Sequence, residues 1–161
     1  MIAQSRTLYA SLSSQLMRLE PLALLALRLL VARVFWNSGL GKVHTVDVAG
    51  LRLPTPSIEQ ATYQLFAYEF FDGAPAWFTD AAAVAATIGE LTLPILVACG
   101  VLARLGAAGL LAMTAVIQIF VYPGEWWSVH AWWAVCLFAV LVRGPGALSI
   151  DRLIGFDAKR P

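Results

Sequence analysis

Four long apolar stretches alternate along the chain with short polar or turn-forming segments. Each is close to the ~20 residues that an α-helix needs to cross the hydrocarbon core of a bilayer. Charged residues are rare inside them, so the pattern is typical of membrane spans and not of soluble amphipathic helices. We therefore predict an all-α integral membrane four-helix bundle, forming a single domain over residues 1–161. The predicted spans are residues 21–41, 81–102, 105–122 and 126–142.

Two further helices are expected outside the spans. Leucines at near-helical spacing within residues 1–20 predict a short helix lying at the membrane interface. The first connection, residues 42–80, is too long to be a plain loop. In it, Ser57 and Gln60 have capping-box spacing, and apolar residues then recur helically up to Tyr68. This segment predicts an aromatic amphipathic helix, either a connector resting on the membrane or a lid over an outward-facing site.

The composition supports the membrane assignment and excludes two classes of function. Of the 161 residues, 60% are hydrophobic and 13% are charged, with a mean hydropathy of +0.74. A soluble domain has about twice that charged fraction, so no separate soluble catalytic domain is expected. The net charge of +1 lacks the basic excess typical of nucleic-acid-binding proteins. The partner that the composition requires is the lipid bilayer, and nucleic acid is excluded.

The basic residues predict how the chain is oriented. They gather in the N-terminal segment, in the turn at Arg104 and in the tail at residues 143–161, which four spans place on one side. The loop at residues 42–80 contains more acidic than basic residues. Because basic residues favour the cytoplasmic side, we predict a multi-pass protein with both termini in the cytoplasm and this loop outside.

A few polar residues lie inside the predicted spans. At ~1.5 Å per residue, Arg33 and Glu90 reach nearly the same depth, so we expect them to pair. Charges at such depth cost about 2.5 to 3.5 kcal/mol and usually face the bundle interior. Arg28 is nearer the cytoplasmic end, which its long side chain is expected to reach. The outer-half polar cluster either fixes helix register or forms a pocket for a quinone head group or another small polar ligand. The candidates are Arg33, Asn37, Lys42, Glu90, Gln118, Tyr122 and His130, followed by His44, Thr87, Thr114 and Trp133.

The sequence contains no self-contained catalytic motif. His44 and His130 lack a third ligand at recognisable spacing, so no metal site is expected. Cys99 and Cys136 form no C-x-x-C pair, and no G-x-S-x-G nucleophile motif is present. The catalytic residues are therefore unknown, and no covalently attached cofactor is expected. Quinone is the one cofactor that the polar cluster suggests.

Short motifs in the first two spans resemble those of a known family. The first span contains Arg33, then aromatic residues, and ends in Gly39-Leu-Gly-Lys42. The second places Pro94 four residues after Glu90, and Gly100 follows six residues later. This combination resembles the DoxX family, and the likeness extends over all four predicted spans. The resemblance implies a small four-helix protein of the bacterial inner membrane, with Arg33, Lys42 and Glu90 at family positions.

The resemblance also implies a choice of functions. DoxX proteins are linked to a thiosulfate:quinone oxidoreductase subunit and to membrane complexes against oxidative or thiol stress, and some lie beside genes for modified, metal-related peptides. The long aromatic loop and the turn at residues 122–130 resemble the peptide-associated members more than the thiosulfate enzyme.

Three hypotheses remain. The chain is a redox-associated, quinone-interacting subunit of an oxidoreductase whose protein partner supplies electrons. Alternatively, it is a non-enzymatic partner or export component for a peptide, metal-related or small-molecule ligand, working with a peptide-maturation protein. In the third, it is a structural scaffold. A homo-oligomer is compatible with all three.

Overall fold

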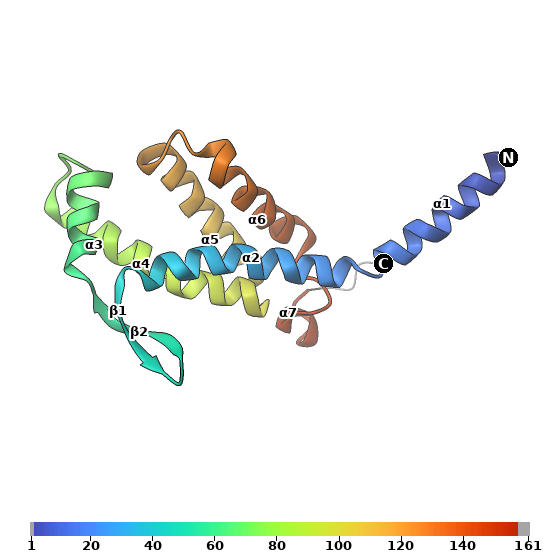
Figure 1. Ribbon diagram of the computed structural model, residues 1–161, viewed down its shortest axis with the longest axis horizontal. Coiled ribbons are helices and arrows are strands. Elements are labelled where there is room, and N and C mark those ends of the chain that lie inside the picture. Colours follow the sequence, from blue (N-terminus) through green and yellow to red (C-terminus); the bar gives the residue numbers. More distant parts are fainter. Residues whose placement is uncertain (1, 158–161) are drawn as a thin grey trace.

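Four long helices form the body of the structure, and a helical arm and a two-stranded hairpin extend from it (Figure 1). The computed structural model describes residues 2–157, apart from the side chains of residues 2–4, 7 and 8. Residues 158–161, the end of the predicted tail, lie outside the described residues. The elements in chain order are α1 (Ile2–Met17), α2 (Glu20–Leu40), β1 (Val43–Val48), β2 (Leu51–Ile58), α3 (Gln60–Leu65), the π-helical η1 (Phe66–Phe70), α4 (Ala76–Cys99), α5 (Ala103–Val116), the π-helical η2 (Ile117–Val121) and η3 (Trp126–His130), α6 (Ala131–Arg143) and α7 (Ile150–Leu153).

The four predicted spans are confirmed as helices long and apolar enough to cross a membrane. They are α2, α4, α5 continued by η2, and η3 continued by α6. The second span begins at Ala76 rather than residue 81, because the extended Pro75 precedes it directly. It ends at Cys99 rather than residue 102, because Gly100 adopts the left-handed conformation that stops a helix, with φ of +69°.

Small residues allow the spans to pack closely. A Cβ atom added at Gly106 would lie 3.0 Å from Val97 Cγ2, and one at Gly109 would lie 2.8 Å from Leu93 Cδ1. Such small residues let helix backbones approach in a membrane, where apolar side chains gain little from leaving lipid. Here they bring α5 against α4. The core shared by the four spans consists of Val31, Phe35, Val97, Ala103, Ala107, Leu110, Cys136, Leu137 and Val140.

At one end of the bundle, which we call the tail end, residues 99–104 and 143–157 form a polar network. Arg28 is 1% exposed and donates to four carbonyl oxygens, those of Val97, Ala98, Pro145 and Leu148. The prediction that Arg28 extends to the membrane surface is therefore wrong. Its guanidinium is satisfied inside the protein, where it ties the end of α4 to the C-terminal segment.

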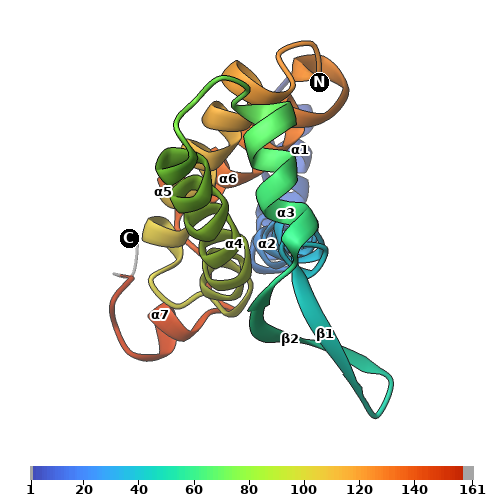
Figure 2. The same cartoon turned by 90° about the vertical axis from the view of Figure 1, so that its left-hand side faces the viewer.

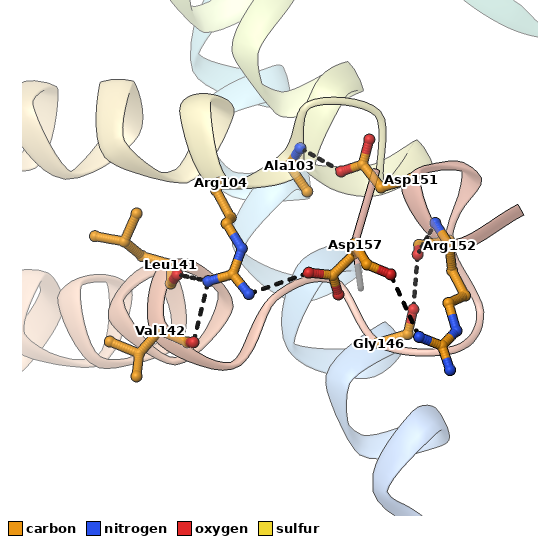
Figure 3. Close-up of polar contacts among 9 residues, drawn as sticks. Ala103, Arg104, Leu141, Val142, Gly146, Asp151, Arg152 and Asp157 are labelled. Carbon is orange, nitrogen blue, oxygen red and sulfur yellow. Dashed lines mark hydrogen bonds and ion pairs between the residues drawn. The ribbon is translucent and has the colours of Figure 1, made fainter. Parts of the chain in front are cut away.

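Two further residues complete the tail end (Figure 3). Asp151 accepts hydrogen bonds from the backbone N–H groups of Leu102 and Ala103, at 2.7 and 2.9 Å, and so caps the first turn of α5. Arg104 donates to the carbonyl oxygens of Leu141 and Val142 and also forms an ion pair with Asp157. The segment after α6 is thereby joined to the turn between α4 and α5.

The opposite end, formed by residues 41–80 and 117–130, is called the hairpin end. There β1 and β2 form an antiparallel hairpin, so the prediction of a purely helical chain is wrong in this segment. Ala49 and Gly50 form its two-residue turn with φ of +53° and +82°, the geometry of a type I′ turn. In both views the hairpin extends sideways from the end of α2 and away from the other helices (Figures 1 and 2).

Both helices predicted outside the spans are present. The N-terminal segment forms α1, which extends away from the bundle beyond α2 (Figure 1). The aromatic helix of the first connection forms as α3 continued by η1, and it lies across the hairpin end (Figure 2). Only the second of these contributes to the site described below.

Candidate functional site

A cavity of about 820 Å³ opens at the hairpin end, with walls from α2, α4, α5 and α6 and from the π-helical segments. Another hollow, of about 750 Å³, lies beside Gln60, Tyr63 and Asp80, and the one carboxylate in it is exposed. The first cavity contains buried charged groups and is the candidate site. Its polar lining residues are Ser38, Lys42, Glu90, Tyr122, Glu125, His130 and Trp133.

A buried ion pair forms part of the cavity wall. Lys42 Nζ lies 2.5 Å from Glu90 Oε2, with the two side chains 13% and 5% exposed. The same ammonium donates to Ser38 Oγ at 2.9 Å. Gly39 makes this contact feasible, because a Cβ there would lie 2.9 Å from Leu91 Cδ2 and 3.1 Å from the carbonyl carbon of Glu90. Helix α2 thus approaches α4 closely enough for Lys42, just beyond the end of α2, to reach the carboxylate.

The predicted pairing of Arg33 with Glu90 is wrong. Arg33 and Asn37 are exposed on α2, and neither lines the cavity. Equal depth along two helices fixes height but not the direction in which a side chain points. Phe35 is buried in the core, and each residue turns an α-helix by about 100°, so residues two positions away project to the opposite side. Lys42, and not Arg33, is therefore the cation that pairs with Glu90.

A second polar group lines the cavity at the start of α6. His130 is buried, its Nδ1 lies 2.6 Å from Gln118 Oε1, and Gln118 Nε2 donates to the Pro123 carbonyl oxygen. The imidazole is thereby held beside Trp133, with ring centroids 5.0 Å apart, and Trp133 also contacts Phe35 edge to face. Gln118 and Trp133, both predicted candidates, thus each contact His130.

Trp133 carries an unsatisfied polar group. Its buried indole Nε1–H has no hydrogen-bond partner among residues 2–157. Buried donors are nearly always paired, so an orphaned donor beside a cavity calls for an explanation. A hydrogen-bond acceptor on a bound molecule would provide one.

Aromatic residues of the first connection cover the cavity. Phe66, Phe70 and Phe71 line it, and Phe66 contacts the other two at centroid distances of 5.1 and 6.1 Å. Phe70 meets Tyr122 at 6.0 Å, and Phe71 meets Phe78 at 5.4 Å. These edge-on contacts join the η1 segment to the third span and to α4. The arrangement favours the lid interpretation of this helix over the connector interpretation.

The cover is tied to the ion pair through the backbone. The carbonyl oxygen of Lys42 accepts from the backbone N–H of Glu59 at 2.9 Å and from Thr62 Oγ1 at 3.1 Å. A displacement of α3 would therefore be transmitted to the lysine that pairs with Glu90. All three π-helical segments also lie at the hairpin end, and such π turns are rare and frequent at functional sites.

Besides Arg33 and Asn37, four predicted candidates do not line the cavity: Gln118, which contacts the lining residue His130, and His44, Thr87 and Thr114. His44 is exposed on β1 and pairs with Glu59 at 2.7 Å. Thr87 and Thr114 are buried, but each hydroxyl donates to the carbonyl oxygen one turn earlier in its own helix, at Ala83 and Leu110. Their hydrogen-bonding capacity is used within the helices.

Several lining residues were not among the predicted candidates. Ser38 and Glu125 are polar, and Ser38 could have been found from its position one turn before Lys42. The apolar lining carries no such signal, because alanine, valine and leucine are common throughout these spans. This part of the lining consists of Leu65, Ala82, Ala85, Ala86, Ala112, Met113, Val116, Ile117, Val121 and Val129.

The charge balance of the lining restricts the ligand. The Lys42 cation is neutralised by Glu90, and Glu125 adds a second carboxylate. An anionic ligand would therefore meet no unneutralised lysine or arginine among the described lining residues. Across residues 2–157, no three His, Cys, Asp or Glu side chains gather closely enough to hold a metal ion.

The fold and this site define a four-span membrane protein with an apolar, aromatic-covered cavity beside a buried ion pair. The family model for DoxX matches residues 23–123, from α2 to just beyond η2, and the chain belongs to the DoxX family. The predicted family is thus confirmed, and the matched range ends before the fourth span. No curated protein and no solved structure matches the chain.

Proposed function

We propose that the cavity binds the head group of a quinone and that the chain serves as a quinone-interacting subunit of a membrane redox complex. The observation that carries this proposal is the orphaned Trp133 Nε1–H beside a largely apolar cavity. A quinone ring is apolar and neutral, and its carbonyl oxygens accept hydrogen bonds. Ligand sites commonly combine an apolar lining with a few placed polar groups, as this cavity does.

The surrounding polar groups complement such a head group. Trp133 supplies one donor, and the Lys42 ammonium, already held by Glu90 and Ser38, lines the same cavity. His130 Nδ1–H donates to Gln118 Oε1, so Nε2 of the neutral imidazole is an acceptor, which suits the hydroxyl of the reduced quinol. The negative lining disfavours thiosulfate, a dianion, as the bound substrate. Electrons for the quinone would come from a protein partner.

The proposed location is the bacterial inner membrane, with the hairpin end facing outward and both termini in the cytoplasm. The distribution of basic residues supports this orientation. A reporter fused after residue 161 is expected to be active only in the cytoplasm, and one inserted between Ala49 and Gly50 only outside. The opposite result would reverse the orientation.

The quinone proposal is tested with Trp133→Phe, which keeps an aromatic ring and removes the Nε1–H donor. Purified protein in lipid nanodiscs is extracted for bound quinone, and a short-chain quinone is then titrated. Losing one hydrogen bond costs about 0.5 to 1.5 kcal/mol, so affinity should fall roughly 2-fold to 12-fold. Trp132→Phe is the matched control, because Trp132 lies on the same helix outside the cavity, and its affinity should equal that of the wild type.

Two outcomes would overturn the proposal. One is the absence of both extracted quinone and saturable binding in the wild type. The other is an equal change in affinity for the Trp132 and Trp133 variants. Recovery of a peptide in place of quinone would favour the non-enzymatic export hypothesis, and recovery of neither would favour the scaffold.

A further inference from the structure

The outer part of the β1–β2 hairpin, residues 46–53, has an aliphatic face. In its register Val46 is opposite Leu53 and Val48 is opposite Leu51, and alternate residues of a strand point to the same side. These four side chains are 43% to 68% exposed, so the chain itself does not cover them.

The other face of the hairpin is polar. Asp47 and Arg52 are directly opposite each other and lie between the aliphatic pairs in sequence, so they point to the opposite side. The hairpin is therefore amphipathic, although no other element within residues 2–157 packs on its aliphatic face. Contiguous exposed apolar patches of this kind mark interaction sites.

The position of the hairpin identifies what this face meets. Strand β1 begins at Val43, directly after the membrane-length helix α2 ends at Leu40, so the hairpin leaves the bundle where a span reaches the bilayer surface. It then runs sideways from the end of α2 instead of continuing along the span (Figures 1 and 2). A hairpin in this position lies over the lipid surrounding the bundle.

The backbone limits how deeply the hairpin enters. Each strand of a two-stranded sheet has an outer edge with no neighbouring strand, and unpaired backbone groups are costly in the hydrocarbon region. At the headgroup level water satisfies these edges while the aliphatic side chains reach the acyl chains. A protein strand is a less suitable partner for β2, because Pro54 and Pro56 lack the N–H groups that strand addition uses.

We propose that the aliphatic face of Val46, Val48, Leu51 and Leu53 docks on the bilayer surface as a lipid-contacting hairpin. It anchors the hairpin end at the membrane interface beside the cavity. This proposal is independent of the quinone proposal, because none of the four residues lines the cavity.

Site-directed spin labelling tests this placement. In full-length protein carrying Cys99→Ser and Cys136→Ala, single cysteines replace Val48 or Leu51 on the aliphatic face, and Asp47 or Arg52 as matched controls. The labelled proteins are placed in phosphatidylcholine nanodiscs. Collisions with oxygen, which concentrates in the bilayer, are compared with collisions with a water-soluble nickel chelate. Each variant is used only if it is monodisperse with unchanged helical content.

The expected result is an oxygen-to-nickel collision ratio several-fold higher at residues 48 and 51 than at residues 47 and 52. Equal, nickel-accessible labels on both faces would overturn the proposal, because the hairpin would then stand in water. Labels at 48 and 51 that are shielded from both reagents would also overturn it, since a second copy or another protein would then cover the face.

Discussion

The tail end and the hairpin end of the bundle both bury charged side chains, but their partners differ in kind. At the tail end Arg28 is held by four backbone carbonyl oxygens, and Asp151 accepts from two backbone N–H groups. At the hairpin end Lys42 and Glu90 hold each other through side chains, and Trp133 has an unpaired donor. The first end uses charge to close helix termini, and the second places an ion pair and an unpaired donor beside a cavity.

This difference separates structural from functional charges in the bundle. Charged residues within membrane spans are functional candidates by default. A cation saturated by main-chain carbonyls cannot engage a ligand without losing the helix ends that it caps. A side-chain pair can adjust, because each partner retains rotamers and the cavity gives them room. A buried charge alone therefore does not identify a ligand site. The kind of partner, main-chain carbonyl or side chain, distinguishes a structural charge from a functional one.

The largest loss of folded protein is expected from Arg28→Met, at the tail end. This change removes the guanidinium donor from four carbonyl oxygens, and of these Val97 O keeps a hydrogen bond from the Gly100 N–H. Each buried group left unsatisfied costs about 1 to 3 kcal/mol. The sum is comparable to the total stability of a small domain, so little folded protein should be recovered. Arg28→Lys should rescue poorly, because an ammonium cannot reproduce the fork of the guanidinium. Fluorescence-detected size-exclusion chromatography of the membrane extract measures the folded fraction.

Arg143→Met is the matched control for this comparison. Arg143 pairs with Glu20 at the same end of the bundle, but both side chains are well exposed. Exposed ion pairs contribute at most about 1 kcal/mol, so this variant should be recovered like the wild type. Equal losses for Arg28→Met and Arg143→Met would show that the carbonyl cluster does not hold the tail end together.

The next largest effect concerns the ion pair at the hairpin end. Glu90→Gln or Lys42→Met alone leaves one buried charge unpaired, which costs about 3 to 5 kcal/mol in soluble cores. The double variant removes both charges and should regain much of that stability, as thermal unfolding in detergent would show. It should nevertheless bind quinone more weakly, because the Lys42 ammonium is lost from the cavity.

Arg33→Met is the control for the ion pair. Arg33 is exposed on the outer side of α2, so its change should leave the unfolding temperature close to that of the wild type. A loss as large as that of Glu90→Gln would mean that Arg33, and not Lys42, carries the pairing. A single Lys42 variant as stable as the wild type would point to the same conclusion.

Much of the fold could be predicted from the sequence because it depends on local properties. Span number follows from the length of apolar stretches, and the aromatic helix follows from its periodicity. The predicted capping box of Ser57 and Gln60 is wrong, because Ser57 lies in β2 and Glu59 precedes the helix without a side-chain cap. The hairpin at residues 43–58 was missed although its strands alternate before and after Ala49-Gly50. The two prolines within residues 51–58 argue against a strand in the sequence, because proline lacks the N–H that pairs strands. They are tolerated because a two-stranded sheet has only edge strands.

The site was predicted in part, for a physical reason. Hydropathy and rise per residue give the depth of a side chain, and depth brought Glu90, Gln118 and His130 to the correct end of the bundle. The rotation of each helix depends on packing, here on Gly39 against α4 and on Phe35 in the core. Those contacts turn Arg33 and Asn37 outward and leave Lys42 beside Glu90.

The smallest changes in stability and quinone affinity are expected from two threonines whose hydroxyls bond within their own helices. The Thr87 and Thr114 hydroxyls donate to carbonyl oxygens within their own helices, at 2.7 and 2.8 Å. Those carbonyls already serve the helix ladder, and valine preserves the branched shape, so Thr87→Val and Thr114→Val should change stability by no more than about 0.5 kcal/mol. Quinone titration should give the wild-type affinity for both, in contrast to Trp133→Phe. A several-fold loss of affinity in either variant, without a change in unfolding temperature, would show that the hydroxyl turns toward the ligand and would extend the site to that helix.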